Sequence, residues 1–276
     1  MPITTILILL GAGLGLGFLS GLLGIGGAII MTPIQYWLYS TMGLSTDLAI
    51  KLSFATTLAV VLPTAASGAW RHNRQGTINW KAATFMGIFT SVAGFLGASI
   101  AARLPGSALK IAFGAVALAI GIRMVMVRIS DVERPIRQER WLYVALAIPI
   151  GLITGILGIG GGAFIVPSLV MVLGYRMRYA VGTSLGIMLF TTVGSVVGYV
   201  VSGLNAPADM PAHTLGYIYW PAWLILTVSS IGMAQLGAIV AHKIHGRILN
   251  YIFCAVQFYV ALNMLGVFTW LMNLFK

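Results

Sequence analysis

The sequence predicts an all-α membrane protein that crosses the bilayer several times and consists of two homologous halves. Three observations predict this: an apolar composition, apolar segments of membrane-spanning length, and a glycine-rich motif that occurs twice. Of the 276 residues, 59% are hydrophobic and only 8% are charged, whereas soluble domains carry about 25% charged residues. Most of the surface must therefore face lipid. The same composition excludes disorder, because disordered chains are poor in apolar residues.

The chain is strongly basic, with a net charge of +11 from 16 Lys and Arg against 5 Asp and Glu. In a soluble protein this balance would suggest nucleic-acid binding. In a membrane protein, basic residues gather in cytoplasmic loops beside anionic lipid headgroups. We therefore expect the lipid bilayer as a partner and no nucleic acid. The single cysteine, Cys254, excludes an internal disulfide and a cysteine metal cluster.

The apolar segments follow one another with short polar breaks. Residues 1–46 contain no ionised side chain, and this stretch is too long for one crossing, which takes about 20 residues. Residues 141–174 form a second overlong segment. The remaining segments are each close to one crossing: 48–70, 82–102, 107–127, 179–202, 219–241 and 248–272.

Both overlong segments contain the same motif. SGLLGIGGAIIMTP (20–33) matches TGILGIGGGAFIVP (154–167) at an offset of 134 residues, and the Gly-x-Ile-x-Trp sequence at Gly76 recurs at Gly216, at an offset of 140. Glycine-rich apolar helices can look alike by chance, but chance does not repeat Trp80, Phe113 and Met124 in register. We predict a first transmembrane repeat at 1–127, a basic cytoplasmic linker at 128–140 and a second transmembrane repeat at 141–276.

The distribution of basic residues predicts the relative orientation of the repeats. If the repeats are parallel, nine Lys and Arg lie inside and seven outside. If each overlong segment is a hairpin that enters and leaves on one side, the repeats are inverted and the count becomes twelve against four. The positive-inside rule favours the inverted arrangement. We expect a multi-pass protein of the plasma (inner) membrane, with both termini outside.

Each hairpin breaks at a glycine cluster, Gly24–Gly27 in the first and Gly158–Gly162 in the second. Each glycine costs a helix about 1 kcal/mol relative to alanine. The N–H groups at the start of the next helix have no intrahelical partner, and in a membrane they must line a cavity or be buried in protein. Two such turns brought together would form a midplane site that favours an anion. Alternatively, the glycines only allow close packing, as we expect for spaced glycines such as Gly13 and Gly198.

The segment after each hairpin begins with hydroxyl side chains, which could donate to an oxyanion or bond back to helix carbonyls. Aligning residues 49–50 with 180–181 places Ser53 opposite Ser184 and Lys51 opposite Gly182. Lys51 could be a counter-charge for an anion, or it could extend to the membrane interface. The predicted substrate-binding residues are Gly24, Gly26, Gly27, Lys51, Ser53, Thr56, Gly158, Gly160, Gly161, Thr183 and Ser184.

Other kinds of site are not indicated. All five acidic residues lie in loops or at segment ends, so we expect neither a cation site nor a carboxylate proton relay. His242 and His245 have a metal-like spacing but belong to a basic loop, which argues against zinc. There is no Walker loop. We predict no catalytic residues, no metal, no cofactor and no enzyme activity; the oligomeric state is left open.

The duplicated glycine motif with its following proline (Gly21–Pro33 and Gly155–Pro167), the hydroxyl-bearing segments and the paired Gly-x-Ile-x-Trp sequences resemble the TauE/SafE sulfite exporter family. The resemblance covers essentially the whole chain. It implies a plasma-membrane secondary transporter of small sulfur-containing oxyanions such as sulfite, sulfoacetate or organosulfonates. An anion channel for the same solutes, or a structural membrane subunit without transport activity, remains an alternative reading of the residues themselves.

Overall fold

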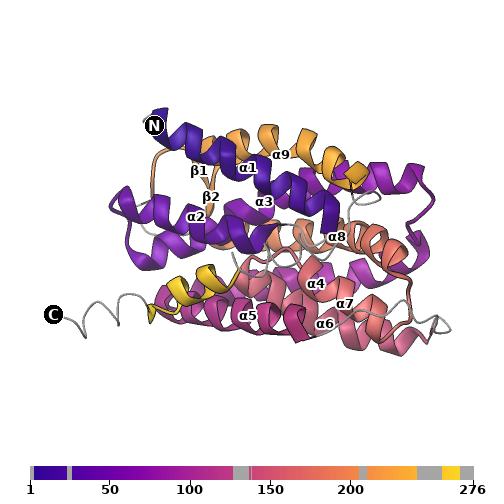
Figure 1. Cartoon of the computed structure of the whole chain (residues 1–276). Coiled ribbons are helices and arrows are strands. Elements are labelled where there is room, and N and C mark those ends of the chain that lie inside the picture. Colours follow the sequence, from indigo (N-terminus) through magenta and orange to yellow (C-terminus); the bar gives the residue numbers. More distant parts are fainter. Residues whose placement is uncertain are drawn as a thin grey trace.

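The computed structural model describes residues 3–23, 27–126, 137, 139–204, 210–240 and 257–267. Most of these residues are helical, and one short antiparallel β-hairpin is present (Figure 1). The elements are α1 (Ile3–Leu23), α2 (Ala28–Thr41), α3 (Thr46–Arg74), α4 (Trp80–Arg103), α5 (Gly106–Met126), α6 (Arg140–Leu157), α7 (Gly162–Met171), α8 (Met177–Gly203), β1 (Thr214–Leu215), β2 (Ile218–Tyr219) and α9 (Trp220–Val240).

The helices form an elongated bundle whose members run roughly along one direction (Figure 1). Six of the described helices are long and apolar enough to cross a membrane: α1, α3, α4, α5, α6 and α8. Large apolar side chains lie exposed on the outer faces of the bundle; on α4, Ile88, Val92 and Leu96 form an exposed stripe at helical spacing. The prediction of an all-α, multi-pass membrane protein is confirmed.

Helices α3 and α8 form the centre of the bundle. In Figure 1 they lie between α1 and α9 on one side and α4 to α7 on the other. Every residue from 49 to 61 in α3, and from 180 to 188 in α8, is buried. A helix that is buried on all faces must be surrounded by other helices.

The spaced glycines are packing positions, as predicted. A Cβ built on Gly198 would lie 2.7 Å from the Phe95 carbonyl oxygen, and one built on Gly13 would overlap the Ser229 side chain. Gly182 and Gly186 also approach neighbouring residues closely. Small residues at these positions allow the helix backbones to come together.

Two pairs of helices pack in the same way. Gly17 of α1 lies against the backbone of Ser230 in α9, and Gly151 of α6 lies against the backbone of Thr90 in α4. Gly17 and Gly151 are separated by the 134-residue offset of the glycine motif, and Thr90 and Ser230 by the 140-residue offset of the Trp motif. Each pair takes one helix from either side of the linker, so the two parts of the chain interlock.

The central helices repeat this correspondence. Thr64 of α3 forms a hydrogen bond of 2.7 Å with Ser230 of α9, and Thr191 of α8 donates one of 2.7 Å to Thr90 of α4. Because Ser230 corresponds to Thr90, Thr64 corresponds to Thr191. The matching offset between α3 and α8 is therefore 127 residues.

This offset corrects the alignment of the two hydroxyl-bearing segments. Ser184 corresponds to Thr57 rather than to Ser53, and Lys51 corresponds to Arg178 rather than to Gly182. The alignment on residues 49–50 and 180–181 failed because a dipeptide of small and apolar residues recurs by chance in apolar helices. At this offset a basic residue stands at both positions, Lys51 and Arg178.

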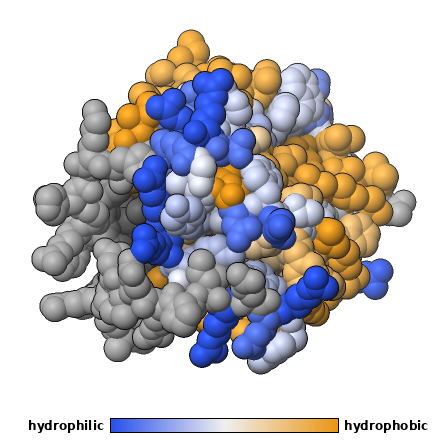
Figure 2. Space-filling model, turned by 90° about the vertical axis from the view of Figure 1, so that its right-hand side faces the viewer, coloured by the Kyte–Doolittle hydropathy of each residue, from blue (hydrophilic) through white to orange (hydrophobic). Residues whose placement is uncertain are grey.

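The bundle has two polar ends. One of them is the end on the right of Figure 1, which Figure 2 shows face-on. There, hydrophilic residues gather around the middle of the face, and hydrophobic residues cover its right-hand side. Here Asn79, before α4, donates to the Tyr175 hydroxyl, which in turn bonds to Tyr143 of α6. We call this the basic end, because eight of the described basic residues lie at it: Arg71, Arg74, Lys81, Arg123, Arg137, Arg140, Arg176 and Arg178. Three others lie toward the opposite end: Lys51, Arg103 and Lys110.

Candidate functional site

Both predicted helix breaks are present. Helix α1 ends at Leu23 and α2 begins at Ala28, while α6 ends at Leu157 and α7 begins at Gly162. Gly27 has a φ of 58°, and Gly158, Gly160 and Gly161 have φ values of 66°, 78° and 82°. These are left-handed conformations that glycine adopts without steric cost. Gly24 and Gly26 lie outside the described residues.

The two breaks lie next to each other in the buried centre of the bundle. A Cβ on Gly160 would lie 3.7 Å from the Cβ of Ala28, the first residue of α2, and 3.3 Å from Val61 Cγ1 of α3. A Cβ on Gly158 would lie 2.7 Å from the Phe54 Cα, also in α3. The second break therefore contacts both the first break, at the start of α2, and the central helix α3.

The starts of α2 and α7 carry no side-chain cap. Their N-cap residues are Gly27 and Gly161, neither helix has a capping hydrogen bond from the N-cap side chain, and neither has an acidic residue in its first turn. The N–H groups of a first helical turn lack intrahelical partners and carry the positive end of the helix dipole. Two uncapped helix starts thus lie close together, and the chemical group that complements them is an anion.

Ser53 and Ser184 make hydrogen bonds within their own helices. The Ser53 hydroxyl donates to the Ala49 carbonyl at 2.7 Å, and the Ser184 hydroxyl donates to the Val181 carbonyl at 2.7 Å. Both side chains are fully buried. In this structure these two hydroxyl protons are used to bond back to the helix, which was the alternative reading of these residues.

Thr56 and Thr183 connect the central helices to other elements. The Thr56 hydroxyl accepts from the backbone N–H of Tyr219, just before α9, at 3.0 Å. The Thr183 hydroxyl accepts from the backbone N–H of Asn79, just before α4, at 3.1 Å. Asn79 and Tyr219 are related by the 140-residue offset, and the two threonines by the 127-residue offset. These threonines accept from the backbone N–H of the residue that directly precedes α4 and α9.

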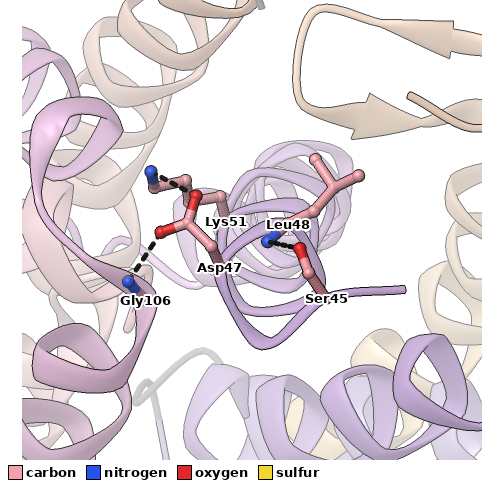
Figure 3. A network of polar contacts seen from close by, with 5 residues as sticks. All are labelled: Ser45, Asp47, Leu48, Lys51 and Gly106. Carbon is pink, nitrogen blue, oxygen red and sulfur yellow. Dashed lines mark hydrogen bonds and ion pairs between the residues drawn. The ribbon is translucent and has the colours of Figure 1, made fainter. Parts of the chain in front are cut away.

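Lys51 is paired with an acidic residue of its own helix (Figure 3). Its Nζ lies 2.8 Å from Asp47 Oδ2, and the other carboxylate oxygen of Asp47 accepts from the Gly106 N–H, at the start of α5, at 2.7 Å. The Lys51 side chain is only 7% exposed. Because Asp47 compensates its charge, we do not include Lys51 in the predicted anion site. The contacts of Asp47 with Lys51 and with Gly106 instead connect the first turns of α3 and α5.

A polar cluster between α2 and α3 was missed at the sequence level. Gln35 Nε2 donates to Thr57 Oγ1 at 3.0 Å, Thr32 Oγ1 lies 3.4 Å from the same atom, and the Tyr39 hydroxyl donates to Gln35 Oε1 at 3.0 Å. Residues 32, 35 and 39 share one face of a helix, and this spacing is the signal that could have revealed the cluster. The positions that match them at the 134-residue offset are apolar: Val166, Leu169 and Leu173.

No group of three or more His, Cys, Asp or Glu side chains that could hold a metal ion occurs among the described residues. His242 and His245, considered above for zinc, and the single cysteine, Cys254, lie outside those residues.

Comparison with known proteins identifies the family. The family model "Sulfite exporter TauE/SafE" matches residues 9–264. The chain belongs to the TauE/SafE sulfite exporter family. A "Probable membrane transporter protein" of Haemophilus influenzae is 30% identical over 95% of this chain and 98% of its own length. A "Probable membrane transporter protein MJ0441" of Methanocaldococcus jannaschii is 28% identical over 91% of this chain and 90% of its own length.

A shorter match, 28% identical, covers 68% of the chain and 76% of the "Probable membrane transporter protein YdhB" of Bacillus subtilis. No solved structure matches the chain. The names of these three relatives state membrane transport and no substrate. This TauE/SafE protein is thus a multi-pass member of a membrane transporter family, and its substrate has to be argued from the site.

Proposed function

We propose that the protein is a secondary transporter that carries a small sulfur-containing oxyanion, such as sulfite, sulfoacetate or a related organosulfonate, across the plasma membrane. One observation carries the proposal: two buried helix starts, at Gly27–Ala28 and Gly161–Gly162, have no side-chain cap and lie beside each other. The substrate-binding groups we propose are the backbone N–H groups of these two breaks.

The electrostatics of the two breaks favour an anion over a cation. Each helix N-terminus is equivalent to roughly +0.5 elementary charge, and two of them lie close together here. In surroundings of low dielectric constant these partial charges act more strongly than in water. The acidic residue nearest to this region in the described sequence, Asp47, is engaged by Lys51 and Gly106 at the start of α3. The other acidic residue in the described part of the chain, Glu139, is exposed just before α6, at the opposite end of that helix from Gly158.

We also propose that the two halves, 1–127 and 141–276, are inverted repeats joined by the linker 128–140. The order of contacts supports this. Along α3 and α9, Ala59 meets Trp223 and Thr64 meets Ser230, so these helices run parallel. Along α4 and α8, Gly87 meets Phe190 and Phe95 meets Gly198, so these also run parallel.

Helices α3 and α4 are joined by the short turn 75–79 and therefore run in opposite directions. It follows that α3 is antiparallel to α8, its counterpart in the second half, and that α4 is antiparallel to α9. Repeats related by a twofold axis in the membrane plane have this property, and transporters built in this way bind their substrates near the bilayer midplane.

We place the basic end of the bundle in the cytoplasm. Eight of the described basic residues lie at that end and three toward the other, which is the asymmetry that the positive-inside rule describes. The linker 128–140 then lies in the cytoplasm, and the α2–α3 turn at Gly43 and the β-hairpin face the outside.

Ligand-induced thermal stabilisation of the purified protein tests the substrate class. A ligand that binds only the folded state raises its apparent stability by about 2.7 kcal/mol at a concentration of 100 Kd. We expect sulfite, thiosulfate or an alkylsulfonate to raise the melting temperature in a saturable way, while choline and neutral amino acids leave it unchanged. Stabilisation by choline without stabilisation by any oxyanion would reject the proposed substrate class.

A further inference from the structure

Two fully buried hydroxyl groups near the helix breaks have no hydrogen-bond partner. They are Ser20 Oγ in α1 and Thr154 Oγ1 in α6, and both residues are 0% exposed. Buried hydroxyls in the central helices α3 and α8 bond back to a carbonyl four residues earlier, as Thr64 and Thr192 do. Such back-bonding is available to every serine and threonine within a helix. The rotamers of Ser20 and Thr154 do not use it.

These two residues occupy the same position in the duplicated motif. Each is its first residue, four positions before the first glycine of the break, and the two are related by the 134-residue offset. A third buried hydroxyl without a partner, Thr227 in α9, has no such counterpart, because Gly87 stands at the matching position. An unpaired hydroxyl that recurs beside both breaks is therefore a feature of the breaks themselves.

The Thr154 side chain is directed toward the start of α7. Its Oγ1 lies 3.1 Å from the position that a Cβ on Gly161, the N-cap of α7, would occupy. The carbonyl of Thr154 accepts from the Gly158 N–H at 2.8 Å, which closes the last turn of α6. The backbone of Thr154 thus ends one helix, while its hydroxyl lies beside the uncapped start of the next.

An unpaired hydroxyl in a buried, membrane-embedded position is unfavourable, because neither water nor lipid replaces the missing partner. Valine has the same shape as threonine and would remove this penalty. Here the penalty occurs twice, at equivalent positions of the duplicated motif, and the Thr154 hydroxyl lies beside a helix start that has no side-chain cap. A ligand oxygen at the breaks would satisfy both kinds of donor at once.

We propose that the hydroxyls of Thr154 and Ser20 are hydrogen-bond donors to the bound oxyanion, one from each half of the protein. The proposal rests on the proposed function, and it adds two side chains to a site otherwise formed by backbone groups. It assigns to the ligand several oxygen atoms around one centre, since donors from two separate helix breaks must be satisfied together. Sulfite, sulfate and sulfonate groups share this geometry.

The test compares the binding of sulfite and of methanesulfonate to the purified full-length protein and to the variants Thr154→Val, Thr154→Ser, Ser20→Ala and Thr227→Val. We expect Thr154→Val to raise the dissociation constant about tenfold to a hundredfold, as for the loss of a hydrogen bond to a charged group. Its melting temperature without ligand should stay unchanged or rise, because an unsatisfied polar group has been replaced by a methyl group. Ser20→Ala should weaken binding to a similar extent.

Two variants provide controls. Thr154→Ser retains the hydroxyl and should bind within about threefold of the wild type, and Thr227→Val removes an unpaired hydroxyl elsewhere and should leave affinity unchanged. Wild-type affinity in both Thr154→Val and Ser20→Ala would overturn this inference alone. Equal loss in Thr227→Val would also overturn it, because the effect would not be specific to the breaks. Failure of the wild-type protein to bind either anion would overturn the proposed function and this inference together.

Discussion

Gly160 and Gly198 show that the glycines of this protein have two different roles. Gly160 has a φ of 78° and lies in the irregular turn between two helices, where an added Cβ would come within 3.3 Å of Val61 and 3.7 Å of Ala28. Gly198 lies inside α8, where it allows the backbone of α4 to approach. The first role shapes the proposed site, and the second only holds helices together.

Substitution by alanine should separate these roles. Gly160→Ala forces an L-residue into a left-handed conformation at a cost of about 1–2 kcal/mol, so the turn should shift and the affinity for sulfite per folded molecule should fall by about tenfold. Gly198→Ala should lower the melting temperature but leave affinity per folded molecule nearly unchanged. Isothermal titration of the monodisperse fraction of each variant measures this. Equal affinity in both variants would show that the break is a packing device.

The Asp47–Lys51 pair should matter for stability rather than for substrate affinity. Asp47→Asn leaves a buried ammonium group without its counter-charge and weakens the contact to Gly106, so we expect a loss of about 1–3 kcal/mol. Replacing Lys51 by Met in the same variant should recover part of this loss, because the uncompensated charge is gone. Thermal unfolding followed by tryptophan fluorescence measures both effects. Loss of sulfite binding in a stable Lys51→Met variant would contradict our exclusion of Lys51 from the site.

The hydroxyls were harder to interpret from the sequence than the glycines. A cluster of glycines leaves few options to a helix, and both predicted breaks occur. A serine or threonine can bond to its own helix, to a neighbouring backbone group or to a ligand at nearly equal cost, and the sequence does not distinguish these cases. Thus Ser53 and Thr56 have partners within the protein, while Thr154, which was not predicted, has none.

At the scale of helices, the apolar segments predicted the elements well. The segments 48–70 and 82–102 became α3 and α4 with bounds one to four residues wider, and the segment 107–127 became α5 with bounds shifted by one residue. Hydropathy determines such spans because lipid excludes charged residues from them. Of the segment 248–272, residues 257–267 lie within the described part of the chain, and residues 257–264 are helical there. The alignment of residues 49–50 with 180–181 gave the wrong register between α3 and α8. Apolar helices differ too little in sequence to be aligned without their contacts.

The Thr64–Ser230 and Thr191–Thr90 hydrogen bonds should contribute similarly to the free energy of unfolding. Thr64→Val removes the hydroxyl that bonds to Ser230, and Thr191→Val removes the one that bonds to Thr90. Hydrogen bonds between membrane helices contribute about 0.6 kcal/mol on average, so each variant should be slightly and similarly destabilised in a reversible unfolding assay. A large loss in one variant and none in the other would contradict the equivalence of the two contacts.

For the whole molecule, the repeated motifs indicated a duplication, but not how the two parts of the chain combine. The packing of α1 on α9 and of α6 on α4 joins segments that lie more than a hundred residues apart. Neither motif alone specifies such a pairing. The asymmetric cluster around Gln35 was likewise invisible to a search for repeats, because its counterparts in the second half are apolar.

The inverted arrangement makes a topological prediction. Single cysteines at Asn73, at the basic end, and at Ala212, before β1, should be modified from opposite sides of the membrane in a Cys254→Ser background. A membrane-impermeant maleimide applied to intact cells should label Ala212→Cys only, and labelling of Asn73→Cys should require opened membranes. Labelling of both positions from one side would reject the inverted model.

Counterflow in proteoliposomes tests the central proposal most directly. Vesicles containing the purified protein are loaded with unlabelled sulfite and diluted into a trace of radiolabelled sulfite. A carrier that binds the oxyanion should accumulate label transiently inside, saturably with sulfite concentration, and the Thr154→Val variant should require about tenfold more sulfite for the same rate. Influx that reaches equilibrium without an overshoot and does not saturate would indicate a channel. The same low influx in vesicles with and without the protein would contradict the account.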